Sequence, residues 1–362
     1  MAADFVIFYK INPMRKGWLI GLGLLIILVV VYFVGPHPAH PVYDKHLPPV
    51  PSDAQALEDY VSIIESRHHL KPNNEARIVW FDTLRRKTPF VVLYLHGFSA
   101  CQEEGNPVHR DMAAAFGCNL YLSRLAEHGI DTPDAMVNLT ADELWNSAKE
   151  AYAIARQLGD SVIIMGTSTG STLALQLAAT YPEDPIKGLI LMSPNIEINN
   201  GAAFLLNNPW GLQIARMVTH SNYYPAKDTA AVTRQYWNAP YRLEALTQLE
   251  ELLESKMVKS TFESVLQPTL MMYYYKDAVH QDSTVKLTAA WKMMDQLGTP
   301  PIYKRQVDIW DAGGHVLGCG LVSHNVPAVE LAIDSFAIRV LHLTQITPMA
   351  LAKTAQDSTV SK

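Results

Sequence analysis

The stretch IIMGTSTGSTLAL, residues 163–175, joins an apolar run to a helix-like run through a turn that contains two glycines. The residues before the turn, 162–165, are typical of a buried strand, and leucines and alanines recur with helical spacing after Ser171. A phosphate-binding loop of the G-x-x-x-x-G-K-[ST] type is excluded, because Gly166 and Gly170 lie only four residues apart and no lysine follows. The stretch therefore predicts a strand, a tight turn and a helix.

The turn itself, Gly166-Thr167-Ser168-Thr169-Gly170, matches the G-x-S-x-G pattern, in which a sharp strand-to-helix turn presents a serine hydroxyl. Such a hydroxyl is a weak nucleophile at neutral pH. Acyl transfer therefore needs a base beside it, an acid that orients the base, and donors for the oxyanion. The pattern alone also fits an ordinary turn, so Ser168 is predicted to be a nucleophile only if the chain supplies these partners.

A base and an acid for this serine occur later in the chain. The expected strand PTLMMYYY leads into a loop that contains Asp277 and Asp282. A further expected strand leads into the glycine-rich segment DAGGH, which ends at His315. The chain order Ser, Asp, His is found where such an elbow carries a catalytic serine. His315 is therefore the predicted base, and either aspartate could be the acid.

Donors for an oxyanion are expected from two backbone amides. The segment YLHGFSA leaves a predicted strand at His96, and a turn there would present the amide of Phe98 opposite Ser168. The amide of Thr169, directly after the serine, is the second expected donor. His96 is interpreted as a residue that shapes this turn.

In these motifs and their order the chain resembles the α/β-hydrolase superfamily, specifically its lipase, esterase and monoacylglycerol-lipase-like serine hydrolases. The matching stretches are LYLHGFSA, NLYLSRLAEHGI, IIMGTSTGSTLAL, QDSTV and DAGGHV, between about residues 76 and 343. More closely, it resembles membrane-anchored bacterial hydrolases of this branch. The resemblance implies an α/β-hydrolase fold, a mostly parallel sheet with helices on both faces, and hydrolysis of acyl or lipid-like esters without a metal or cofactor.

Two features depart from the family pattern. Threonines flank Ser168 where His, Met or Ala are common, and the acid-bearing loop is longer than the usual G-x-x-D-x-x-V. Asp282 is the preferred acid because Ser-Thr-Val follows it and reproduces D-x-x-V. Asp277, only two residues past the expected strand, is the alternative, and Asp308 is a more distant one.

Short apolar runs alternate with helical segments along the chain, which predicts an α/β domain. The expected strands are 76–81, 90–95, 118–123, 161–165, 188–192, 269–275 and 303–310. Helices are expected at 53–68 and 241–257, and Thr140 with Glu143 forms a predicted capping box. The long segment at about 195–267 is expected to be a cap, in which Trp210 and Tyr236 either pack internally or line an acyl-binding wall.

The N-terminal part contains the uncharged run WLIGLGLLIILVVVYFV, residues 18–34. As a helix it is about 26 Å long, close to the ~30 Å of a bilayer core. Basic residues precede it, which favours a cytoplasmic N-terminus and an extracytoplasmic main domain. A cleaved signal peptide is the alternative. The expected divisions are a cytoplasmic start at 1–16, a transmembrane signal-anchor at 17–35, a proline-rich spacer and helix at 36–75, the hydrolase domain at 76–343 and a polar tail at 344–362.

Composition narrows the possible functions. The chain of 362 residues is 49% hydrophobic and has a formal charge of −6, so neither disorder nor nucleic-acid binding is expected. Cys101, Cys118 and Cys319 lack metal-ligand spacing and are interpreted as packing residues. Two alternatives stay open: a catalytically silent binding protein of the same fold, and a hydrolase of amide or thioester bonds.

Overall fold

The computed structural model describes residues 13–226 and 230–346, with side chains at 13–17 and 20 outside the description. Its centre is a seven-stranded sheet in the order β1-β3-β2-β4-β5-β8-β9. The strands are β1 (Arg77–Val79), β2 (Thr88–Leu95), β3 (Asn119–Leu122), β4 (Gly159–Thr167), β5 (Ile186–Met192), β8 (Thr269–Tyr273) and β9 (Lys304–Asp308). All neighbours pair in parallel except β1, which is antiparallel to β3.

All seven predicted strands are present, within a few residues of the expected bounds. The central ones are apolar on both faces: residues 91–95 of β2 and 162–165 of β4 are fully buried. Parallel strands covered by helices on both sides read as continuous apolar runs, which is why these segments were recognisable in the sequence.

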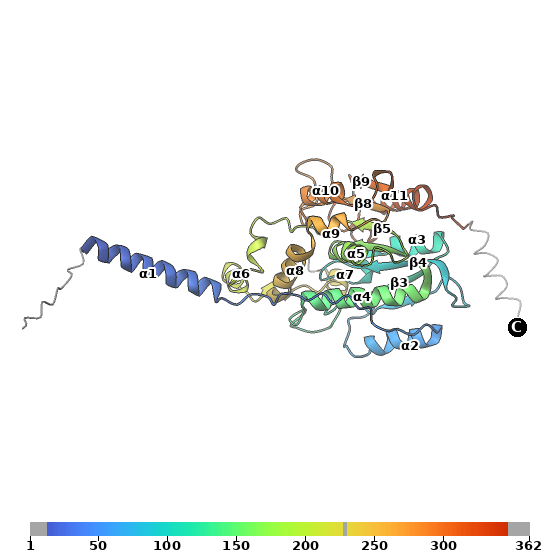
Figure 1. Cartoon of the computed structure of the whole chain (residues 1–362). Coiled ribbons are helices and arrows are strands. Elements are labelled where there is room, and N and C mark those ends of the chain that lie inside the picture. Colours follow the sequence, from blue (N-terminus) through green and yellow to red (C-terminus); the bar gives the residue numbers. More distant parts are fainter. Residues whose placement is uncertain (1–12, 227–229, 347–362) are drawn as a thin grey trace, which may run out of the picture.

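Helices cover both faces of the sheet and close two separate cores (Figure 1). On one face lie α2 (Ala54–Glu65), α4 (Ala141–Leu158), α5 (Thr169–Thr180) and α10 (Leu287–Gln296). On the other lie α3 (Val108–Ala115) and α11 (Val326–Arg339). The short 3₁₀ turns η1 (Gln102–Gly105) and η3 (Pro301–Tyr303) lie in loops. The predicted two-sided α/β architecture is thus confirmed.

The start of α4 confirms the predicted capping box. The Thr140 side chain accepts a hydrogen bond from the Glu143 amide at 3.1 Å, and the Glu143 carboxylate accepts one from the Thr140 amide at 3.0 Å. The proline-rich segment 36–51 contains no helix or strand and lies against this helix. The Trp145 indole donates to the Asp44 carbonyl at 2.7 Å. The segment is therefore bound to the surface of the domain and is not a separate spacer.

The segment between β5 and β8, residues 193–268, is called the cap segment below. It contains η2 (Ala203–Leu205), α6 (Gly211–Thr219), β6 (Tyr223–Tyr224), α7 (Ala231–Tyr236), β7 (Tyr241–Arg242), α8 (Leu243–Lys256) and α9 (Lys259–Glu263). Figure 1 shows α6 and α8 gathered at the end of the body that is nearest to α1 (Pro13–Phe33). The long insertion is therefore built mainly of helices.

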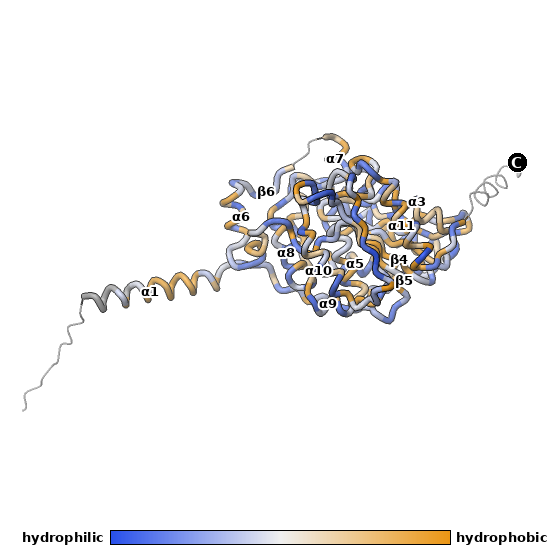
Figure 2. The backbone as a smooth tube through the Cα atoms, turned by 90° about the horizontal axis from the view of Figure 1, so that it is seen from above, coloured by the Kyte–Doolittle hydropathy of each residue, from blue (hydrophilic) through white to orange (hydrophobic). Residues whose placement is uncertain are grey.

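Helix α1 projects away from the body (Figure 2). The large apolar side chains described in it, from Trp18 to Phe33, are exposed. None of the helices, within the described residues, combines the length and the hydropathy that crossing a membrane requires. The predicted transmembrane segment at 17–35 is therefore not confirmed. The predictions for 1–12 and for the end of the tail, 347–362, concern residues outside those described.

Candidate active site

Ser168 occupies a sharp turn between a strand and a helix. Strand β4 ends at Thr167, α5 begins at Thr169, and Ser168 between them has φ 53° and ψ −116°. Positive φ is costly for a residue with a side chain and persists only where the surroundings enforce it. Glycine is required two residues later, because a Cβ at Gly170 would overlap the Leu95 carbonyl where α5 passes close to the end of β2.

Backbone hydrogen bonds hold the serine against the end of β5. The Ser168 amide donates to the Met192 carbonyl at 2.9 Å, and the Asn195 amide donates to the Ser168 carbonyl at 3.2 Å. Ser193, between these two contacts, donates through its hydroxyl to the His315 carbonyl at 2.7 Å. The segment after β5 therefore contacts both Ser168 and the loop that carries His315.

His315 and Asp282 form a short, sheltered pair. Nδ1 of His315 lies 2.6 Å from Oδ2 of Asp282, whose side chain is completely buried, while that of His315 is 16% exposed. The other oxygen of Asp282 accepts the amide hydrogens of Thr284 and Val285 at 2.8 and 3.3 Å. Burial raises the pKa of Asp282, but attraction to His315 and these hydrogen bonds outweigh burial, so its pKa lies below the ordinary value. The carboxylate is ionised at neutral pH and orients the imidazole.

The alternative acids lie elsewhere. Both oxygens of Asp277 are 3.0 Å from Nδ1 of His280, on an exposed loop. Asp308 ends β9, where its backbone pairs with β8. The structure thus brings Asp282, and not Asp277, to His315. The predicted D-x-x-V alignment agrees with this arrangement, because the amides of Thr284 and Val285 both donate to Asp282.

The predicted oxyanion turn directly follows β2. His96 is fully buried, its Nε2 accepts the Leu125 amide hydrogen at 3.0 Å, and its Nδ1 lies 2.9 Å from the Gly97 carbonyl oxygen. Burial lowers the pKa of His96 well below its usual range, so the ring is neutral and acts as an acceptor. Ser99 has φ 65°, and the Phe98 ring packs edge-on against Tyr241 from the cap segment. His96 thus shapes the turn, as its sequence position suggested.

One residue at this turn was not identified from the sequence. Glu104 is 2% exposed, and its carboxylate accepts the Gly97 amide hydrogen at 2.5 Å. The adjacent Glu103 accepts a hydrogen bond from Asn106 instead. The two glutamates are consecutive in η1, and no sequence pattern distinguishes the one whose side chain is buried.

The two cap aromatics differ in their surroundings. The Trp210 amide and indole donate to the carbonyls of Pro36 and Val31, both at 2.9 Å, so this residue joins the cap segment to the end of α1. Tyr236 ends α7 and is half-buried. Two residues later the Asn238 amide donates to the Ser99 carbonyl at 2.6 Å, which brings this part of the cap segment to the oxyanion turn.

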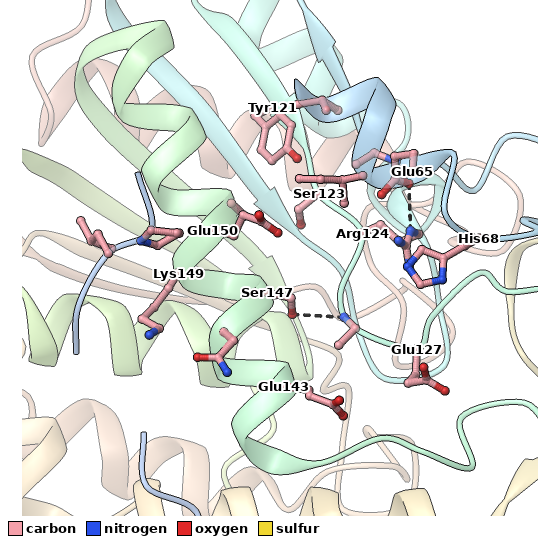
Figure 3. Close-up of a pocket in the computed structure, with 18 of the residues that line it drawn as sticks. Glu65, His68, Tyr121, Ser123, Arg124, Glu127, Glu143, Ser147, Lys149 and Glu150 are labelled. Atoms are coloured by element: carbon pink, nitrogen blue, oxygen red, sulfur yellow. Dashed lines mark hydrogen bonds and ion pairs between the residues drawn. The ribbon is translucent and has the colours of Figure 1, made fainter. Parts of the chain in front are cut away.

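Two large cavities lie away from these residues. One, of about 630 Å³, is an open pocket lined by α2, α4 and the proline-rich segment, and the Glu65–Arg124 ion pair at 2.8 Å lies in its wall (Figure 3). The other, of about 710 Å³, lies between α8, α9 and α10. Neither is lined by Ser168, Asp282 or His315. Among the residues that the structure describes, no group of three His, Cys, Asp or Glu side chains could hold a metal ion.

Known proteins resemble this chain in sequence and in fold. A sequence model described as alpha/beta hydrolase fold matches residues 91–357. Over 110 residues the chain is 31% identical to a thermostable monoacylglycerol lipase of Bacillus sp. (strain H-257), a stretch covering 30% of this chain and 42% of that relative. The match therefore spans less than half of that relative's length.

Solved structures agree in architecture. One from a study of LipS and LipT, two metagenome-derived lipolytic enzymes, has a TM-score of 0.58 at 17% identity and covers 74% of this chain and 98% of its own. The monoacylglycerol lipase of Paleococcus ferrophilus has a TM-score of 0.50 at 13% identity, covering 72% and 98%. At such identities the likeness concerns the fold alone. Together with the family match over most of the chain, the sheet order and the strained serine turn, it shows that this chain belongs to the alpha/beta hydrolase fold family.

Proposed function

We propose that the protein is a serine hydrolase that cleaves carboxylic esters through a Ser168–His315–Asp282 triad. The observation that carries the proposal is the 2.6 Å hydrogen bond between His315 and a completely buried Asp282, on loops at the same sheet edge as the turn of Ser168. A buried, ionised acid bonded to Nδ1 leaves Nε2 of the imidazole free of the proton, which is the tautomer that a base requires.

The reaction proceeds in two halves. His315 takes the hydroxyl proton as Ser168 forms a bond to the ester carbonyl carbon, and the carbonyl oxygen becomes an oxyanion that accepts hydrogen bonds from the Phe98 and Thr169 amides. The alcohol leaves with the proton from His315. Water then attacks the acyl-enzyme by the same route, its proton passing to His315, and the acid departs while Ser168 regains its hydrogen.

Lipid-like acyl esters are the proposed substrates. Support comes from the similarity to a monoacylglycerol lipase and from the aromatic residues of the cap segment beside the oxyanion turn, where Tyr241 contacts Phe98. Apolar walls with a few placed polar groups favour an acyl chain over a charged ligand.

A tagged fluorophosphonate tests the nucleophile. Wild-type protein should be labelled, and Ser168→Ala should abolish labelling and turnover without changing the thermal unfolding midpoint. Ser171→Ala removes a hydroxyl in the first turn of α5, one that donates to the Gly166 carbonyl at 2.6 Å. It is the control for loss of a nearby serine hydroxyl and should still be labelled. Persistent labelling of Ser168→Ala would reject this nucleophile, and an unlabelled wild type would favour a silent binding protein. A panel of matched esters, thioesters and amides then identifies the bond that is cleaved.

Attachment to a membrane is a further part of the proposal. Large apolar side chains of α1 are exposed, including Trp18 at 84% and Phe33 at 72%, and contiguous apolar surface of this kind needs an apolar surrounding. Lys10, Arg15 and Lys16 before it favour a cytoplasmic N-terminus. The catalytic domain would then lie outside the cytoplasm. Protease added to cells with a permeabilised outer envelope should digest the domain and spare cytoplasmic proteins; protection would reverse the orientation.

A further inference from the structure

Glu104 is a buried carboxyl group to which the hydrolytic triad assigns no task. It lies in η1, just after the oxyanion turn, and only 2% of its surface is exposed. Glutamate is almost never this buried unless it is paired. Its carboxyl group accepts the backbone amide hydrogen of Gly97, the residue before Phe98, at 2.5 Å, and the side chains of Trp237 and Tyr94 are further partners. The carboxyl group therefore contacts the part of the chain that presents an oxyanion donor.

The contact with Gly97 is a close fit. A Cβ at Gly97 would lie 2.8 Å from Oε1 and 2.9 Å from Oε2 of Glu104, so the carboxyl group fills the space that a side chain would take. It both accepts the Gly97 amide hydrogen and packs on the Gly97 α-carbon. The Phe98 amide belongs to the next peptide group, so contacts at both the amide and the α-carbon of Gly97 restrict the directions that the Phe98 N–H bond can take.

The cap segment closes over the same turn. The Trp237 side chain faces the Glu104 carboxyl group, and the adjacent Asn238 amide donates to the Ser99 carbonyl at 2.6 Å. The Asn238 side chain in turn accepts the Gly129 amide hydrogen at 2.8 Å. Glu104 thus lies between the oxyanion turn and the cap, away from bulk water.

The titratable groups that face Glu104 come from three parts of the chain. They are Tyr94 on β2, Cys101 before η1, and Cys319 and His315 in the loop after β9. Burial raises the pKa of Tyr94 and of both thiols, that of Cys319 to about 11, so all three are neutral. Of the facing groups, His315 is the one that can become a cation.

Burial also raises the pKa of Glu104 itself, to about 7, against the lowering effects of the Gly97 amide and His315. Near neutral pH a substantial fraction of the carboxyl group is ionised. Its negative charge favours the imidazolium form of His315, which is the form that arises during acylation.

We propose that Glu104 is a positioning residue of the reaction: it fixes the oxyanion turn through the Gly97 amide and stabilises the positive charge that His315 gains. This inference rests on the proposed function, since it needs His315 to act as the base. It adds to the triad a second carboxyl group that acts on the base from the side of the oxyanion turn.

Three variants of the full chain test the proposal, with Glu103→Gln as the matched control. Glu104→Gln keeps an oxygen acceptor for the Gly97 amide but removes the charge, and Glu104→Ala removes both. Glu104→Ala should lower kcat by about 10- to 100-fold with little change in KM, less than the loss of a direct oxyanion donor. Glu104→Gln should retain most of kcat.

The pH profile distinguishes positioning from a merely structural role. With the charge removed, His315 loses its proton at lower pH, so the acidic limb of kcat/KM for Glu104→Gln should move to lower pH. The profile of Glu103→Gln should superimpose on that of the wild type. The rate of fluorophosphonate labelling should show the same dependence on pH as kcat/KM, because labelling uses the same base and the same oxyanion donors.

The outcomes separate the two proposals. If wild type labels at Ser168 but Glu104→Gln has the wild-type profile, or Glu104→Ala keeps full kcat, the role of Glu104 is rejected while the triad stands. If Glu104→Ala fails to fold, the profile of Glu104→Gln decides alone. If Ser168→Ala retains wild-type turnover, the proposed function fails first, and the role of Glu104 fails with it.

Discussion

At the scale of single residues, geometry singles out one serine and one carboxylate among many. Ser168 has a positive φ at the end of β4, and its amide and carbonyl groups are bonded to Met192 and Asn195, so backbone contacts hold the strained turn. Asp282 is distinguished by complete burial and by its bond to His315.

The acid can be tested by isosteric substitution. Asp282→Asn keeps the shape but favours the wrong imidazole tautomer, so kcat should fall by on the order of 10⁴-fold. Asp277→Asn is the matched control. It breaks only the exposed contact with His280 and should remain near wild type in a steady-state ester assay. A collapse of Asp277→Asn alone would mean that the acid loop adopts another register.

The base is tested in the same way. His315→Ala should lower turnover by several orders of magnitude, about as much as removing the nucleophile, because the two groups act as a unit. His280→Ala, whose ring is mostly exposed and bonded to Asp277, should change turnover little. Comparable losses in the two variants would contradict the assignment of His315.

At the scale of elements, α4 should depend on its capping box. Thr140→Ala removes an acceptor for the Glu143 amide, and the free energy of unfolding should fall by about 1 kcal/mol. Denaturant unfolding measures it. Thr288→Ala, an exposed position in α10, is the control and should stay within about 0.5 kcal/mol of wild type. An unchanged midpoint for Thr140→Ala would mean that packing alone fixes where α4 begins.

Glu250, a buried residue of helix α8, should make the free energy of unfolding depend on pH. Glu250 is 4% exposed, one of its carboxyl oxygens has no hydrogen-bond partner, and burial raises its pKa to about 7. A raised folded pKa contributes stability below the unfolded value of 4.5, and this contribution is lost as pH rises through about 7. Glu250→Gln should therefore unfold at a higher temperature than wild type at pH 8 but not at pH 4. Glu263→Gln, an exposed control, should shift neither midpoint, and equal shifts of Glu250→Gln at both pH values would contradict this reasoning.

At the scale of the whole molecule, the cap segment connects the sheet edge to α1. Tyr236 precedes the residues that contact the oxyanion turn, whereas Trp210 is bonded to Val31 and Pro36. Tyr236→Ala should therefore reduce kcat/KM for long acyl esters more than for short ones, because only long chains reach the cap. Trp210→Phe, which loses the indole donor and one of the two rings, should not alter chain-length preference. Equal losses of Tyr236→Ala on short and long esters would assign Tyr236 to folding.

The sequence by itself determined the elements and the chain order of the site. Buried parallel strands are apolar throughout, so their positions can be predicted from short apolar runs. The capping box and the serine turn each consist of a few consecutive residues, so local sequence patterns were sufficient to predict them. Tertiary structure decided which aspartate meets His315, because partners 33 residues apart are joined only once the loops after β8 and β9 fold together. Tertiary structure also decided that Glu104, and not Glu103, is buried, and that the proline-rich segment packs against α4. These outcomes depend on contacts between distant segments, and burial and partner geometry across such contacts have no local signature.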